Sequence, residues 1–162
     1  MKLKQQLFLA LLRISMGWIF LWAFLDKVFG LGYATAPDKS WLVGTSPTLG
    51  FLKFGTAGPF KSIFQSLAGN AIVDWLFMLG LLGVGIALTL GIGKKLSTMS
   101  GSLLLLLMWL AAIPPKNNPF MDEHIIYIFV LQLLLQLHSG EVFGLGKWWN
   151  ETSLVKKFSF LK

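Results

Sequence analysis

Four long apolar stretches that hold almost no charge constrain this sequence most. They cover residues 7–25, 75–92, 96–113 and 125–139, and Arg13 is the one Asp, Glu, Lys or Arg within them. About 20 apolar residues in a helix cross the ~30 Å hydrocarbon core of a bilayer. Backbone groups in lipid must pair internally, which favours helices. The sequence therefore predicts an all-α fold, an integral membrane four-helix bundle forming a single domain over residues 1–162.

Composition agrees with a membrane environment. The chain is 55% hydrophobic and 13% charged, whereas soluble domains are about 25% charged. A water-soluble bundle would need polar helix faces, and these are missing. We expect spans at approximately 5–29, 71–92, 96–114 and 120–143. They leave an outer loop, 30–70, and a cytoplasmic tail, 147–162.

A cleaved signal peptide is the alternative interpretation of the first stretch. Lys2 and Lys4 would form its basic end. However, Arg13 interrupts the apolar run, and no small-residue cleavage site follows it. We therefore expect the stretch to be the first membrane span.

Lysines outside the apolar stretches are distributed unequally. With both termini cytoplasmic, the inner set is Lys2, Lys4, Lys94, Lys95, Lys147, Lys156, Lys157 and Lys162, and the outer set is Lys39, Lys53, Lys61 and Lys116. Basic residues near span ends favour the cytoplasmic side, so this orientation in the cytoplasmic membrane is predicted. The net charge of +7 then indicates a lipid partner. Nucleic acid is not expected as a partner, because that would require a basic face on a soluble fold.

The loops carry helix signals of their own. Ser46–Pro47 and Pro59 are typical of helix starts, so we expect two short amphipathic helices in the first outer loop, the second with an apolar face at Phe60, Ile63, Phe64 and Leu67. Asn118 is expected to cap the fourth span. The small residues Gly83, Ala87 and Gly91 are four apart, which predicts a face for close helix packing.

Residue types exclude several cofactors. There are no cysteines, so thiolate metal sites and iron–sulfur ligation are excluded for this chain. His124 and His138 are roughly 21 Å apart along a helix and cannot ligate one haem. No haem, flavin or iron–sulfur motif is present, and no metal site is predicted.

The remaining polar residues of interest lie within the predicted spans or at their outer ends. Arg13 either snorkels to the headgroups or contacts the bundle interior. The side chains of Lys27, Asp74, Asp122, Glu123 and His124 fall near the outer ends of the predicted spans. Acids in a first helical turn are favoured by the helix dipole, which explains Asp74, Asp122 and Glu123 without any function. The alternative is a pocket that binds a polar headgroup such as a quinone ring.

Several segments resemble a known family. The stretch "LRISMGWIFLWAFLDKVFGLG" is similar to the first helix of the DoxX family of small four-helix membrane proteins. The stretches "TSPTLGFLKFGTAGPF", "DWLFMLGLLGVGIAL" and "NPFMDEHIIYIFVLQLLL", followed by "GLGKWW", resemble the DoxD-like branch. That resemblance implies the small membrane subunit of a thiosulfate:quinone oxidoreductase.

Two functions follow as hypotheses. The first is a membrane subunit of a quinone-linked oxidoreductase, with quinone as substrate and Arg13, Lys27, Asp74, Asp122 and His124 as candidate quinone or anion contacts. Its partners would be a second oxidoreductase subunit or further copies of the chain. The second is a non-catalytic membrane scaffold or assembly protein for redox or stress-response partners. The missing redox ligands favour the second hypothesis, and the resemblance favours the first.

Overall fold

The computed structural model describes residues 2–161, and within that range every regular element is helical. Four long helices form the body of the fold: α1 (Leu3–Phe29), α3 (Ala71–Leu90), α4 (Lys94–Ala112) and α5 (Glu123–Gln136). The short elements are η1 (Pro37–Lys39), η2 (Trp41–Val43), η3 (Phe51–Gly55), α2 (Lys61–Ser66), η4 (Ser139–Glu141), α6 (Gly146–Glu151), α7 (Ser153–Lys157) and η5 (Ser159–Leu161). The all-helical prediction is confirmed for this range.

Three helices, α1, α3 and α4, are long and apolar enough to cross a membrane. Large apolar side chains such as Trp18, Leu79, Leu103 and Phe129 point outward and are more than half exposed. Such extensive exposed apolar surface is unusual for a soluble monomer and is typical of a protein in lipid. α5 is also apolar but has only 14 residues.

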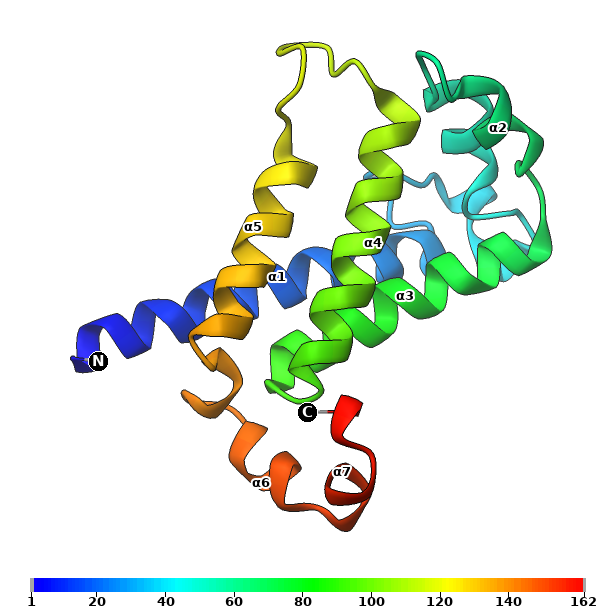
Figure 1. The fold of residues 1–162 in the computed structure, drawn as a ribbon. Coiled ribbons are helices and arrows are strands. Elements are labelled where there is room, and N and C mark those ends of the chain that lie inside the picture. Colours follow the sequence, from blue (N-terminus) through cyan, green and yellow to red (C-terminus); the bar gives the residue numbers. More distant parts are fainter. Residues whose placement is uncertain (1, 162) are drawn as a thin grey trace.

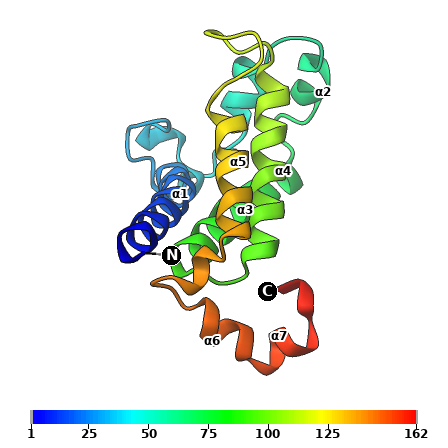
Figure 2. The same ribbon diagram turned by 60° about the vertical axis from the view of Figure 1, so that its left-hand side comes forward.

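The long helices form two packed pairs (Figures 1 and 2). α1 packs along α3, and α4 packs along α5. α3 and α4 share a tight corner at residues 91–93 and diverge from it, so that the two pairs cross in Figure 1. Where the pairs meet, Phe20, Val84, Leu131 and Leu134 are almost fully buried.

Glycine lets α1 and α3 approach closely, but not at the predicted positions. A Cβ on Gly85 would lie 2.6 Å from Leu21 Cγ, and one on Gly17 would lie 2.5 Å from Thr89 Oγ1. A Cβ on Gly83 would meet nothing within 4 Å. The predicted packing face is therefore wrong at Gly83, because the buried side of α3 is rotated from that stripe.

The first loop is folded, as predicted. Helical turns follow Pro47, continuing into η3, and α2 begins two residues after Pro59. Figure 1 shows these turns beside the ends of α3 and α4 that point away from the shared corner. The Ala57 amide donates to the Ala111 carbonyl at 2.9 Å and ties the loop to the end of α4. On α2, Ile63 is exposed while Phe64 is partly shielded.

The fourth helix is shorter than the predicted range 120–143. α5 begins at Glu123, and its cap is Asp122. The prediction of Asn118 as cap is wrong. Asn118 instead accepts from the amides of Phe120 and Met121, at 2.9 Å each, and forms a separate turn. The segment after α5 folds back beneath the corner between α3 and α4 (Figure 1).

Candidate functional site

Arg13 lies inside the fold. Its side chain is 1% exposed, and Nη1 donates to the carbonyls of Leu88 and Thr89 at 2.7 and 2.9 Å. Nη2 donates to Phe143 and Val142 at 3.1 and 3.4 Å. The last carbonyls of a helix have no partner within the helix, so Arg13 caps α3 from outside. Snorkelling is therefore the wrong alternative.

Glycines surround the guanidinium. A Cβ on Gly91 would lie 2.7 Å from Arg13 Nη1, and one on Gly144 would lie 3.0 Å from Nη2. Gly91 also has φ +77°, and a Cβ on Gly140 would lie 2.2 Å from the Gly91 carbonyl oxygen. Side chains at these positions would displace Arg13 or separate the two loops that it joins. Arg13 thus holds α1, the end of α3 and the segment after α5 together.

Asp74 holds the first loop. One carboxylate oxygen accepts from Thr48 Oγ1 at 2.6 Å, Ser46 Oγ at 2.8 Å and the Thr48 amide at 3.3 Å. Ser46 Oγ also accepts from the Leu49 amide at 3.2 Å, which starts the helical turn there. A carboxylate that accepts three hydrogen bonds from the fold has a structural role. Asp74 therefore fixes the loop on the first turn of α3.

Asp26 has a similar role that sequence reasoning missed. It is 2% exposed, and its oxygens accept from the amides of Tyr33 and Ala34 at 3.2 and 3.0 Å. Its neighbour Lys27 has its Nζ 6.0 Å from the ring centroid of Phe77 on α3. That distance is at the limit of a cation–π contact. Among residues 2–161, Lys27 makes no ion pair.

Asp122 and His124 form a direct pair at the start of α5. His124 Nδ1 lies 2.9 Å from Asp122 Oδ2. The other oxygen, Oδ1, accepts from the His124 and Ile125 amides at 3.0 and 3.4 Å and caps the helix. The side chains of Asp122 and His124 are 13% and 17% exposed, respectively. One carboxylate therefore caps α5 and also orients an imidazole.

Of the five predicted site residues, only Asp122 and His124 are bonded to each other. Arg13 lies roughly 21 Å along α1 from Lys27. Among the residues described, no hydrogen bond or ion pair links Lys27, Asp74 and the Asp122–His124 pair. A shared pocket of these residues stays a prediction.

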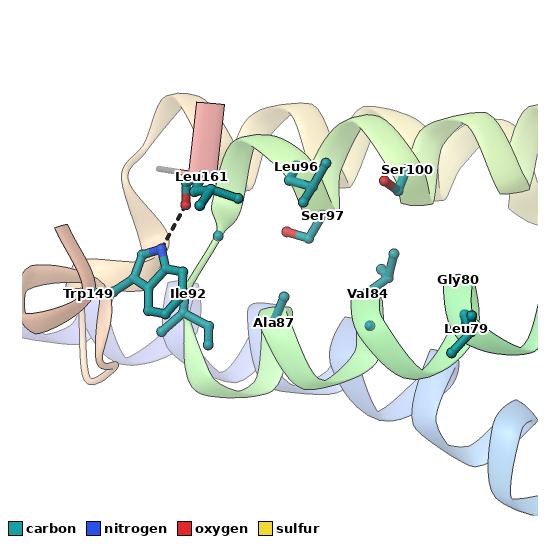
Figure 3. A pocket seen from close by; sticks show the side chains of 12 residues that line it. Leu79, Gly80, Val84, Ala87, Ile92, Leu96, Ser97, Ser100, Trp149 and Leu161 are labelled. Carbon is teal, nitrogen blue, oxygen red and sulfur yellow. Dashed lines mark hydrogen bonds between the residues drawn. The ribbon is translucent and has the colours of Figure 1, made fainter. Parts of the chain in front are cut away.

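The structure has a cavity of about 410 Å³ between α3 and α4 (Figure 3). None of the five predicted site residues lines it. Its walls are mostly apolar, and its polar contributions include Ser97 and Ser100 from α4. Two of the small residues predicted to pack against a neighbouring helix, Gly83 and Ala87, line this cavity instead.

The residues that sequence reasoning missed differ in whether the sequence could have revealed their role. Asp26 lies in the last turn of the apolar helix α1 and precedes Gly30, whose φ of +64° ends that helix. A carboxylate before such a turn is a recognisable loop anchor. Ser46 and Thr48 carry no comparable signal, because their partner is 28 and 26 residues away.

Over residues 2–161, the geometry defines an all-helical fold with three helices that can span a membrane and one shielded Asp–His pair. Within residues 2–161, no three His, Cys, Asp or Glu side chains are grouped to hold a metal ion. No family model, curated protein or solved structure matches this chain.

Proposed function

We propose that this protein is a four-helix subunit of the cytoplasmic membrane with both termini inside. The support is the set of three apolar helices, the apolar α5 and the excess of lysine on the proposed inner side. At ~1.5 Å per residue, the 14 residues of α5 cover roughly 21 Å. The flanking apolar residues of the same segment complete the crossing in this proposal.

We further propose that it binds a quinone for a quinone-linked oxidoreductase of the thiosulfate:quinone type. The Asp122–His124 pair carries this proposal. Quinone reduction takes two electrons and two protons, and the ring oxygens need hydrogen-bond donors. Asp122 occupies Nδ1 of His124, so Nε2 is the nitrogen that we assign to a quinone oxygen. Nε2 donates to that oxygen when the imidazole carries a proton on both nitrogens, with the Asp122 carboxylate as its counter-charge. A carboxylate partner fixes the tautomer and orientation of an imidazole.

Electrons must come from another subunit. The chain has no cysteine, and its two histidines lie at opposite ends of α5, roughly 21 Å apart along a helix. It therefore supplies no iron–sulfur ligands and no histidine pair for one haem. In the proposed reaction, two thiosulfate ions lose one electron each and form tetrathionate in the partner. The quinone takes both electrons and two protons and becomes quinol. The resemblance to the DoxX family and its DoxD-like branch is the basis for naming thiosulfate.

Within this proposal the other candidates have narrower roles. Arg13 and Asp74 are positioning residues, because their hydrogen bonds go to the fold itself. Lys27 is the candidate anion contact, since its ammonium is not in an ion pair among the described residues.

The second candidate is a non-catalytic scaffold for redox or stress-response partners. It is favoured by one observation: three of the buried charged side chains, Arg13, Asp26 and Asp74, are bonded to the fold. A scaffold needs a fixed shape and no free polar groups for chemistry.

One experiment separates the two. The purified protein, alone and with its co-purifying partners, is incubated with thiosulfate and a short-tailed quinone analogue. If the protein is a quinone-binding subunit, it binds the analogue without its partner, and the analogue is reduced only when the partner is present. A scaffold retains the partner but neither binds the quinone nor changes its reduction.

A further inference from the structure

The cavity between α3 and α4 exists because several of the α3 residues that line it are small. Gly80, Gly83 and Ala87 line it opposite Ser97 and Ser100 of α4 (Figure 3). The two helices diverge from their corner, and small residues leave the wedge unfilled. Its volume of about 410 Å³ falls within the ~300–1,000 Å³ of ligand pockets.

The cavity is closed at one end and open at its side. At the corner, the Trp149 indole donates to the Leu161 carbonyl at 2.7 Å and forms an end wall from the C-terminal segment (Figure 3). Towards the side, Gly83 is exposed, as are Leu79 and Leu96. With α3 and α4 in a membrane, that side faces lipid.

The chemistry of the walls suits a hydrocarbon chain. The lining is mostly apolar, and the Ser97 hydroxyl donates to the Lys94 carbonyl at 3.1 Å, so its hydrogen is already used. A cavity that offers few free polar groups does not favour a polar ligand. It gives an alkyl chain packing contacts along α3 from Leu79 to Ala87.

The elements that form the closed end of the cavity carry positive charge. Four of their lysines are exposed: Lys95 at the start of α4, Lys147 on α6, and Lys156 and Lys157 on α7. A fifth, Lys94, pairs with Glu141 at 3.3 Å. From 93 to 161, Glu141 and Glu151 are the only acids outside α5 and the loop before it. Basic residues at this depth attract anionic headgroups.

We propose that this cavity holds one acyl chain of an anionic phospholipid, with the headgroup beside Lys95. The site goes beyond the proposed quinone function and is separate from it. The Asp122–His124 pair lies at the other end of the α4–α5 pair, near the loop that joins these helices (Figure 1). The inner leaflet would supply the lipid in the orientation proposed above.

The test is native mass spectrometry of the full chain released from nanodiscs. The nanodiscs contain phosphatidylglycerol and phosphatidylcholine with identical acyl chains in equal amounts. We expect one phosphatidylglycerol to remain bound to the native protein. Gly83→Leu should fill the cavity without a backbone clash, since a Cβ there meets nothing within 4 Å. It should remove the bound lipid. Lys95→Glu should reduce the bound fraction roughly tenfold.

Two matched variants control for general effects. Gly50→Leu adds the same side chain at a glycine in the first loop that also has open space around it. Lys61→Glu makes the same charge change on α2. Both should retain the lipid. The proposal is overturned if phosphatidylcholine is retained equally, if Gly83→Leu keeps its lipid, or if the controls lose theirs as well. Quinone binding near His124 is measured separately, and its absence leaves this result unaffected.

Discussion

The guanidinium of Arg13 donates a hydrogen bond to the carbonyl of Leu88, 75 residues later in the chain, at 2.7 Å. A buried charge usually needs an opposite charge or several hydrogen bonds. Arg13 uses backbone carbonyls: two at the end of α3 and two in the segment after α5. It therefore fixes three parts of the chain to one another and has the role of a structural tie.

Removing Arg13 should destabilise the protein. Arg13→Leu leaves four carbonyls without their donor, and we expect the free energy of unfolding to fall by about 2 kcal/mol. Thermal melting in mild detergent measures this change. Lys4→Leu is the control, because Lys4 is exposed on the same helix. An unchanged or higher melting temperature for Arg13→Leu would mean that its charge is not bound inside the fold.

Two glycines of α3 should respond in opposite ways to the same change. Gly85→Ala puts a Cβ 2.6 Å from Leu21 Cγ and 2.9 Å from the Leu21 amide nitrogen, which should cost about 1–3 kcal/mol. Gly83→Ala enters open space and should be neutral or slightly stabilising, since alanine favours helix over glycine. Comparing the two melting temperatures tests the packing of α1 on α3. Equal effects would contradict it.

Asp74 should limit how often the first loop opens to a protease. All three donors use one oxygen, Oδ1, so Asp74→Asn can keep them and should have a small effect. Asp74→Leu leaves Ser46 and Thr48 without their acceptor and should loosen the loop. Trypsin cleavage after Lys53 should then be about tenfold faster, because cleavage follows the open population. Equal rates for the Asn and Leu variants would show that Asp74 does not hold the loop.

The positions of the helices could be predicted from the sequence more reliably than the polar contacts could. The apolar stretches predicted α1, α3 and α4 to within a few residues, because length and hydropathy decide whether a segment forms such a helix. The side of α3 that packs closely was not predicted. Gly83 and Gly85 look alike in a run of small residues, and only the position of Leu21 distinguishes them.

The candidate site shows the same limit. Asp122 and His124 were both candidates, but their direct contact was not predicted, because it depends on Asp122 being the cap of α5. The acceptors of Arg13 are backbone carbonyls up to 130 residues away. Every residue has a backbone carbonyl, so the sequence does not show which ones accept. The same holds for the hydroxyl groups that bind Asp74.

The proposed orientation can be tested with a reporter enzyme fused to the C-terminus. Four crossings with both termini inside predict that a reporter active only outside the cytoplasmic membrane is inactive there. The same reporter inserted after Gly44, in the first loop, should be active. Activity at the C-terminus would contradict the inferred topology, and with it the inner position of the lysines around the cavity.

The most direct test of the central claim compares the two histidines in a quinone-binding titration of the purified protein. His124→Asn and His138→Asn make the same change at a shielded and an exposed position, and asparagine tolerates the positive φ of His138. We predict that His124→Asn weakens the binding of a short-tailed quinone analogue at least tenfold, with little change in melting temperature. Asp122→Asn should keep an acceptor for the helix cap yet also weaken binding, while His138→Asn binds like the native protein. Native affinity in both His124→Asn and Asp122→Asn would contradict the account.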